Sequence, residues 1–333
     1  MIIDILKELS AINSAPGADA ELLSYIEKKY GKYCDSVKRD GVGNLLLIKK
    51  GSGGKSEKLM LTAASTGCGC IVNYIEENGY IRITKLGNAG SYCAVYSEVV
   101  FENGTRGFVL PEMGAEIKDV DFSKIYVDIG AKSREEAEKC VKLGDVCAFP
   151  SRITSLCTDR VCISGSSAIL GMAILIEVLT EISDCTLQND IVFAFNIQDA
   201  PRNLSAKVSA YTAQCDKFIL ADVCDSFDVQ GANRRGEAVL GDGAVIIAKS
   251  ADHCANPEMR AELEGICEKD NIKHKTCVYA DMTTQAGNVA KSGKGAAGLA
   301  VCVPVRNRLG TAQIFEISDA ECVKKLILSY TGR

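Results

Sequence analysis

The spacing of apolar residues divides the chain into segments with different hydrophobic patterns. Residues 3–13 and 18–32 repeat apolar side chains at helical intervals, with a break at 13–17 that contains a proline and a glycine. Two apolar runs of strand length follow at 43–48 and 58–64. Continuous apolar runs of this length are typical of buried strands. The first part of the chain therefore predicts two helices followed by two strands.

The hydrophobic pattern changes at about residue 68, and the new pattern continues to about residue 150. Short stretches with alternating apolar and polar residues are separated by turn residues, at 79–83, 95–102, 106–110 and 124–129. Alternation with a period of two is the pattern of half-buried strands joined by tight turns. This middle segment predicts a small β-rich insert.

Beyond the insert, helical and strand patterns alternate again. A long apolar helix is predicted at 168–182, followed by buried strands at 190–197 and 217–223. Further strands are expected at 245–248 and 299–303, and further helices at 257–270 and 319–330. Such alternation indicates an α/β fold with a mostly parallel sheet that helices cover on both faces.

Composition narrows the range of functions. A chain of 333 residues can form two domains, and its net charge of -5 argues against a nucleic-acid partner. The N-terminal segment is amphipathic and carries acidic residues, so it does not have the form of a signal peptide. No apolar stretch approaches the roughly 20 residues of a membrane span. We therefore expect a cytoplasmic protein with no membrane partner.

The 16 cysteines are spread along the chain, mostly one at a time. Several lie inside apolar runs, as Cys162, Cys224 and Cys302 do, which is typical of reduced thiols that fill a core. Cys68 and Cys70 form the one close pair, but no second pair or nearby histidine completes a zinc site. We interpret the cysteines as small apolar core residues.

Several short stretches, in this order along the chain, resemble the glutamyl and deblocking aminopeptidases, the tetrahedral aminopeptidases that include proteins once named endoglucanase M. They are residues 40–45, 126–137, 143–145, 241–243 and 304–306. The resemblance runs nearly end to end. It implies a phosphorylase/hydrolase-like metallopeptidase domain formed by residues 1–67 and 156–333. Residues 68–155 would form an inserted β-barrel used in dimerisation.

In that family, two divalent ions, zinc or cobalt, share a bridging water, and a glutamate takes the proton of this water before it attacks the peptide carbonyl. The ions lower the pKa of the water and polarise the carbonyl. At the positions where the resemblance implies metal ligands, this chain mostly has residues of other types. Ala64 stands at a histidine position, Thr66 at an aspartate, Ser167 or its neighbour at the bridging aspartate, Ala200 at a glutamate ligand and Leu309 at the last histidine.

Two carboxylates remain at the family's functional positions. Asp222 is the retained ligand position, although an aspartate after a buried strand also commonly closes a turn. Asp199 stands at the general-base position and is one methylene shorter than the family's glutamate. Because a buried carboxylate needs a partner, we expect each aspartate to have a cationic or hydrogen-bonding partner in a cleft that includes Thr66. Arg202 and Arg306, the nearest cations by sequence, are the candidates.

The chain has two histidines, His253 and His274, which lie outside the ligand segments on elements expected at the surface. A site with so few ligands does not fit a pair of zinc-like ions, so we predict no cofactor. The sequence favours a non-catalytic pseudo-peptidase with a binding or assembly role, self-associating through the insert. Peptides and an active relative stay open as further partners. The alternative is an active metallo-aminopeptidase that works through an atypical site.

Overall fold

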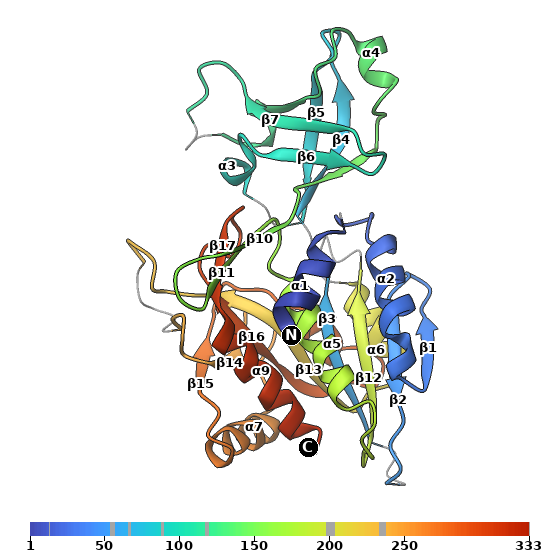
Figure 1. Ribbon diagram of the computed structural model, residues 1–333, viewed down its shortest axis with the longest axis vertical. Coiled ribbons are helices and arrows are strands. Elements are labelled where there is room, and N and C mark those ends of the chain that lie inside the picture. Colours follow the sequence, from blue (N-terminus) through green and yellow to red (C-terminus); the bar gives the residue numbers. More distant parts are fainter. Residues whose placement is uncertain are drawn as a thin grey trace.

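The chain builds a large α/β body and a smaller β-barrel that stands at one end of it (Figure 1). The computed structural model describes residues 1–12, 14–53, 57–65, 68–87, 90–116, 120–197, 204–232 and 238–332.

An eight-stranded sheet forms the centre of the α/β body. Its order is β1 (Ser36–Arg39), β2 (Leu45–Lys49), β12 (Asp190–Asn196), β3 (Lys58–Ala64), β13 (Lys217–Asp225), β16 (Ala297–Val305), β14 (Ala244–Lys249) and β15 (His274–Val278). The four central strands β12, β3, β13 and β16 are parallel to one another, and β14 is antiparallel to β16. The predicted mostly parallel sheet is therefore confirmed.

Helices cover both faces of this sheet. One face packs against α1 (Ile2–Ser10), α2 (Ala20–Tyr30), which continues into a 3-10 turn at Gly31–Tyr33, α5 (Ile169–Glu181), α7 (Pro257–Lys269) and α9 (Ile317–Tyr330). The other face packs against α6 (Ser205–Ala213) and α8 (Ala286–Ala290). The two faces have separate apolar clusters, which is the layered arrangement that an α/β sheet requires.

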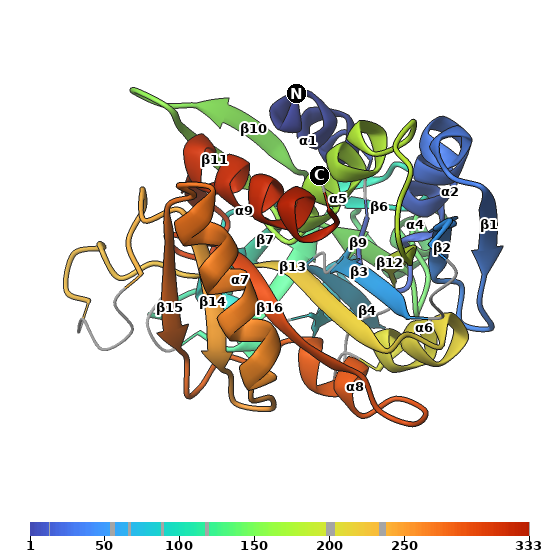
Figure 2. The same cartoon turned by 90° about the horizontal axis from the view of Figure 1, so that it is seen from below.

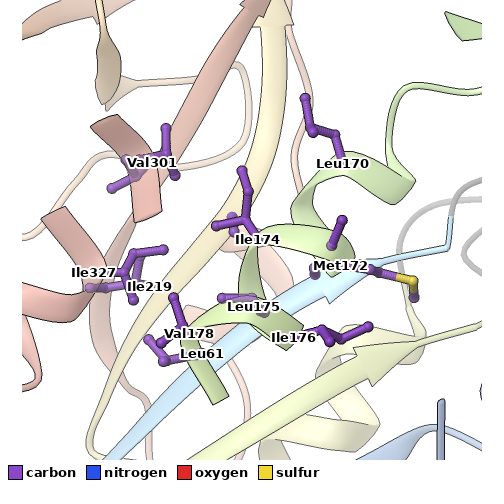
Figure 3. Packing of buried hydrophobic residues seen from close by; sticks show 14 of the residues in the cluster. Leu61, Leu170, Met172, Ile174, Leu175, Ile176, Val178, Ile219, Val301 and Ile327 are labelled. Carbon is purple, nitrogen blue, oxygen red and sulfur yellow. The ribbon is translucent and has the colours of Figure 1, made fainter. Parts of the chain in front are cut away.

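Helix α5 is largely apolar because it lies between the sheet and other helices. Eleven of its 13 residues are buried. Figure 3 shows its side chains pointing in several directions, with Leu61, Ile219 and Ile327 around it. Gly171 lies where α5 passes closest to the sheet, because a Cβ at this position would be 2.2 Å from the carbonyl oxygen of Ala221. A residue without a side chain is needed at this crossing.

The inserted segment forms a closed barrel with its own apolar core. The strands in barrel order are β4 (Gly69–Ile75), β5 (Ile81–Leu86), β8 (Ile125–Asp128), β7 (Arg106–Pro111), β6 (Glu98–Phe101) and β9 (Val146–Ala148). Two short helices, α3 (Ser91–Ala94) and α4 (Arg134–Glu138), and a 3-10 turn at Phe122–Lys124 complete it. Closure removes the exposed strand edges that an open sheet would present.

A small second sheet joins segments that are distant in sequence. It consists of β10 (Arg152–Ser155), β11 (Arg160–Ser164) and β17 (Gln313–Glu316). Strand β10 lies within the predicted insert 68–155 but pairs with β11, so the barrel strands themselves end at Ala148. The pairing of β11 with β17 brings the start of α5 next to the loop after β16.

No helix in the described ranges is both long enough and apolar enough to span a bilayer. Seven of the cysteines are buried: Cys70, Cys147, Cys215, Cys224, Cys267, Cys277 and Cys302. The interpretation as apolar core residues is therefore right for Cys224 and Cys302, but Cys162 is only partly buried and Cys140, Cys157 and Cys254 are exposed.

Candidate functional site

Two of the described positions singled out in the sequence, Ala64 and Asp222, lie toward the carboxyl edge of the central strands. Ala64 ends β3 and lies opposite Asn196, the last residue of β12. Asp222 lies near the end of β13, opposite Cys302 of β16. Since these strands are parallel, their carboxyl ends share one edge, which is where open α/β sheets hold ligands.

Ala64 and Leu309 have purely hydrocarbon side chains. Ala64 is buried and presents only a methyl group. Leu309 follows β16 and is 42% exposed. Neither side chain has an atom that can donate electrons to a metal ion.

Ser167 lies just before α5 and is buried, and its hydroxyl donates a hydrogen bond to the side-chain oxygen of Gln313 in β17. The amide nitrogen of Gln313 in turn donates to the carbonyl oxygens of Gly165 at 2.8 Å and Gly310 at 3.0 Å. Gln313 thus ties the start of α5 to the loop after β16. The hydroxyl of Ser167 is part of this structural network, because buried polar groups need such partners.

Asp222 is partly buried at the edge, and burial raises the pKa of its carboxyl group. The backbone N–H of Val223 donates to one carboxylate oxygen at 2.8 Å. This hydrogen bond and the positive charge of Arg308 both act to lower the pKa of Asp222, against the larger effect of burial. Arg308 itself pairs with Asp225, with 3.1 Å between Nη2 and Oδ2. Its Nε is buried and has no hydrogen-bond partner within the described ranges.

Arg306 does not supply the charge that was predicted for Asp222. Its Nε lies 3.0 Å from Oδ1 of Asp228, and its Nη2 lies 2.5 Å from Oδ2, which is a bidentate pair. Burial acts to raise the pKa of Asp228, but hydrogen bonds from Arg306 and Ser226 hold it below its ordinary value. The predicted pairing of Arg306 with Asp222 is therefore wrong, and Arg308 is the cation that acts on Asp222.

Four of the proposed site residues lie outside the described residues: Thr66, Asp199, Ala200 and Arg202. Next to this segment, the buried Asn196 donates from its amide nitrogen to Thr62 at 2.8 Å and to Gln285 at 2.7 Å. The sequence analysis missed this contact, because Gln285 is distant in the chain and no motif marks it.

Both histidines are partly buried rather than solvated: His253 lies toward the start of β16, and His274 begins β15 at the side of the sheet. One ring nitrogen of His253 is 3.0 Å from the carbonyl oxygen of Gly298, and the ring packs on Phe218. His274 has a ring nitrogen 3.2 Å from the carbonyl oxygen of Ile272. Both ring nitrogens thus contact backbone carbonyl groups of the α/β body.

The described residues at this edge offer few donors for a metal ion. In the parts of the chain that the structure describes, no three histidine, cysteine, aspartate or glutamate side chains gather closely enough to hold a metal ion. Asp222 is the one carboxylate at a described ligand position, and Arg308 places a positive charge beside it. A cation next to a lone carboxylate disfavours a second cation there.

The fold and this edge define a metallopeptidase-like α/β protein with an inserted barrel. The chain belongs to the M42 glutamyl aminopeptidase family, whose profile matches residues 43–326. The expectation drawn from the sequence is thereby confirmed at the level of the family.

Individual relatives agree with this assignment. The chain is 29% identical to a putative aminopeptidase of Acetivibrio thermocellus over 98% of this chain and 97% of that protein. It is 26% identical to the lysyl aminopeptidase of Pyrococcus furiosus over 88% of this chain and 85% of that protein.

Among solved structures, a TET aminopeptidase from a marine-sediment Thaumarchaeota archaeon superposes with a TM-score of 0.93 at 21% identity, covering 100% of this chain and 96% of that one. The Pyrococcus horikoshii TET1 peptidase, described as assembling into a tetrahedron or a large octahedral shell, has a TM-score of 0.85 at 23% identity, with 99% of each chain covered. These likenesses show the fold.

Proposed function

We propose that this protein is a non-catalytic member of the M42 family, a pseudo-peptidase that keeps the fold and has exchanged the metal-binding residues for other contacts. The observation that carries the proposal is the chemistry at the described ligand positions. Ala64 and Leu309 have no donor atom, and Ser167 donates its hydroxyl hydrogen to Gln313. A two-metal hydrolase needs several deprotonated ligands in a fixed array.

The electrostatics of the edge support the same proposal. Removing two dications from a cleft leaves any remaining carboxylate without a counter-charge, which is costly when the carboxylate is partly buried. The carboxylate of Asp222 instead lies in the field of Arg308, a cation that belongs to the chain itself. The permanently charged guanidinium of Arg308 thus compensates the negative charge that metal ions would compensate in an active member of the family.

A role in assembly is supported by the surface of the barrel. Five large apolar side chains of the barrel segment are exposed: Tyr74, Tyr96, Phe108, Met113 and Leu143. The dodecameric PhTET1 structure and the TET1 shells are assemblies of proteins with this fold. We propose that the barrel mediates self-association, and that peptides or an active relative are further partners.

We expect the intact chain to form at least a dimer in solution, since burying exposed apolar side chains against a partner stabilises the assembly. Replacing Phe108 and Met113 with serine should shift the mass measured by light scattering toward the monomer. Replacing Leu156, an exposed leucine outside the barrel strands, with serine is the matched control and should leave the mass unchanged. A monomeric intact protein would count against the assembly role.

An active metallo-aminopeptidase with an atypical site is the second candidate. It is favoured by the carboxylate of Asp222 and by relatives that are named as aminopeptidases. The two candidates differ in what Asp222 does, because a metal ligand is essential for activity and a turn residue is not.

The test is hydrolysis of glutamyl and lysyl anilides in the presence of zinc or cobalt, comparing the wild type with Asp222→Asn. We expect no metal-dependent hydrolysis, and equal background rates for the two proteins. Hydrolysis that requires the metal and disappears in Asp222→Asn would establish the second candidate instead.

A further inference from the structure

A second site lies at the opposite edge of the sheet. A cavity of about 560 Å³ opens where β3, β13 and β16 begin, with Lys58 and Asp216 in its lining. Ala64 and Asp222 lie toward the other ends of these parallel strands. The cavity is therefore separate from the candidate metal edge. Figure 2 shows α6 and α8, whose ends border the cavity, beside each other under the strands.

The walls of this cavity combine apolar and aromatic groups. Ala210 of α6 and Val289 of α8 are buried and contribute apolar surface. Tyr211 also lines the cavity and is 67% exposed, so its ring borders the open side. A volume of this size lies within the range of small-molecule pockets, which are apolar with a few placed polar groups.

The charges of the lining favour an anion. Asp216 is already saturated, because Lys294 lies 3.0 Å from Oδ1 and the backbone N–H of Lys58 donates to Oδ2 at 3.0 Å. These two contacts hold the pKa of Asp216 below its ordinary value. The side-chain ammonium of Lys58 is half-buried and has no ion pair or hydrogen bond within the described ranges. The lining thus holds two cations, Lys58 and Lys294, against the single carboxylate of Asp216, so an entering ligand meets a net positive charge.

We propose that this cavity binds a small organic carboxylate with a flat apolar body, whose carboxylate pairs with Lys58 and whose body lies against Tyr211, Ala210 and Val289. The proposal does not depend on the loss of catalysis at the other edge. A hydrogen bond between an ammonium and a carboxylate is stronger than a neutral one, and Ala210 and Val289 add apolar contact to it.

The test uses benzoate as the probe and benzyl alcohol as its neutral counterpart, followed by chemical shifts of the full-length isotope-labelled protein. Benzoate should shift the amide signals of residues 210–216 and 292–296. Lys58→Met keeps the aliphatic stem and should weaken benzoate binding by about tenfold, the usual value of one hydrogen bond to a charged group. Lys269→Met, at an exposed position of α7, should bind benzoate like the wild type.

A second variant protects the test against a folding defect in the first. Tyr211→Ala changes an exposed side chain, so the fold should persist, and benzoate binding should weaken several-fold. Benzyl alcohol should bind at least about tenfold more weakly than benzoate. Benzoate shifts elsewhere on the protein, or unchanged affinity in both folded variants, would overturn the proposal.

Discussion

Replacing Gly171 with alanine should destabilise the protein by about 3 kcal/mol or more, the upper range for forcing atoms into a packed core. The added Cβ would lie 2.2 Å from the carbonyl oxygen of Ala221 and 2.9 Å from its carbonyl carbon. Both are backbone atoms of a central strand, so neither can move without displacing β13. Helix α5 is enclosed on all sides and cannot retreat from the sheet.

The matched control is Gly265→Ala in α7, because Gly265 is also helical but has nothing within 4 Å of an added Cβ. There the change should stabilise the protein by roughly 0.5–1 kcal/mol, since alanine is the better helix former. Urea unfolding of both variants measures the two effects, which have opposite signs. Equal stability of Gly171→Ala and wild type would show that α5 does not cross the sheet as described.

Replacing Lys324 with methionine should cost about 3–5 kcal/mol, because it leaves the buried carboxylate of Glu177 without its cation. Glu177 is 2% exposed, and Lys324 lies 3.3 Å from it and also contacts Glu181 at 3.1 Å and Glu321 at 2.8 Å. The second oxygen of Glu177 has no partner within the described ranges. Three carboxylates would then face one another without the lysine.

The loss of stability in Lys324→Met should depend on pH. Burial raises the pKa of Glu177 above its ordinary value, and Lys324 opposes this rise, so Lys324→Met raises the pKa further. A raised folded-state pKa means that the folded protein binds the proton more tightly, so stability is lowest above that pKa and recovers as pH falls through it. The difference between variant and wild type should therefore shrink toward acid pH.

A double variant separates the ion pair from the packing of the lysine stem. Glu177→Gln with Lys324→Met should recover part of the stability at neutral pH, because no buried charge remains unpaired. Chemical unfolding at several pH values measures all four proteins of this cycle. Additive effects with no coupling between the two positions would contradict the assigned role of Lys324.

Long periodic segments could be predicted from the sequence, and contacts across the fold could not. The helix expected at 168–182 is α5, and the alternating strands after residue 68 do form a separate β unit, because apolar spacing is local information. The small sheet of β10, β11 and β17 was missed. Its strands are short and partly polar, and Gln313 meets Ser167 only after the whole body has folded.

The error over Arg306 has a local cause. Arg306 and Arg308 follow the same strand and are separated only by Asn307, whose φ of 56° places it in the left-handed region. The two side chains have different partners, since Arg306 pairs with Asp228 and Arg308 pairs with Asp225. The sequence places both arginines just after β16, near the carboxyl edge of the sheet. It does not show the backbone turn that decides which aspartate each arginine meets.

The central claim is that the residues at this edge do not hold a pair of metal ions. Elemental analysis of the purified full chain, after dialysis against zinc or cobalt and removal of free metal, tests it directly. Asp222→Asn serves as the control for metal bound elsewhere. We predict no stoichiometric pair of ions and the same metal content in both proteins. Two ions per wild-type chain, with metal lost in Asp222→Asn, would contradict the account.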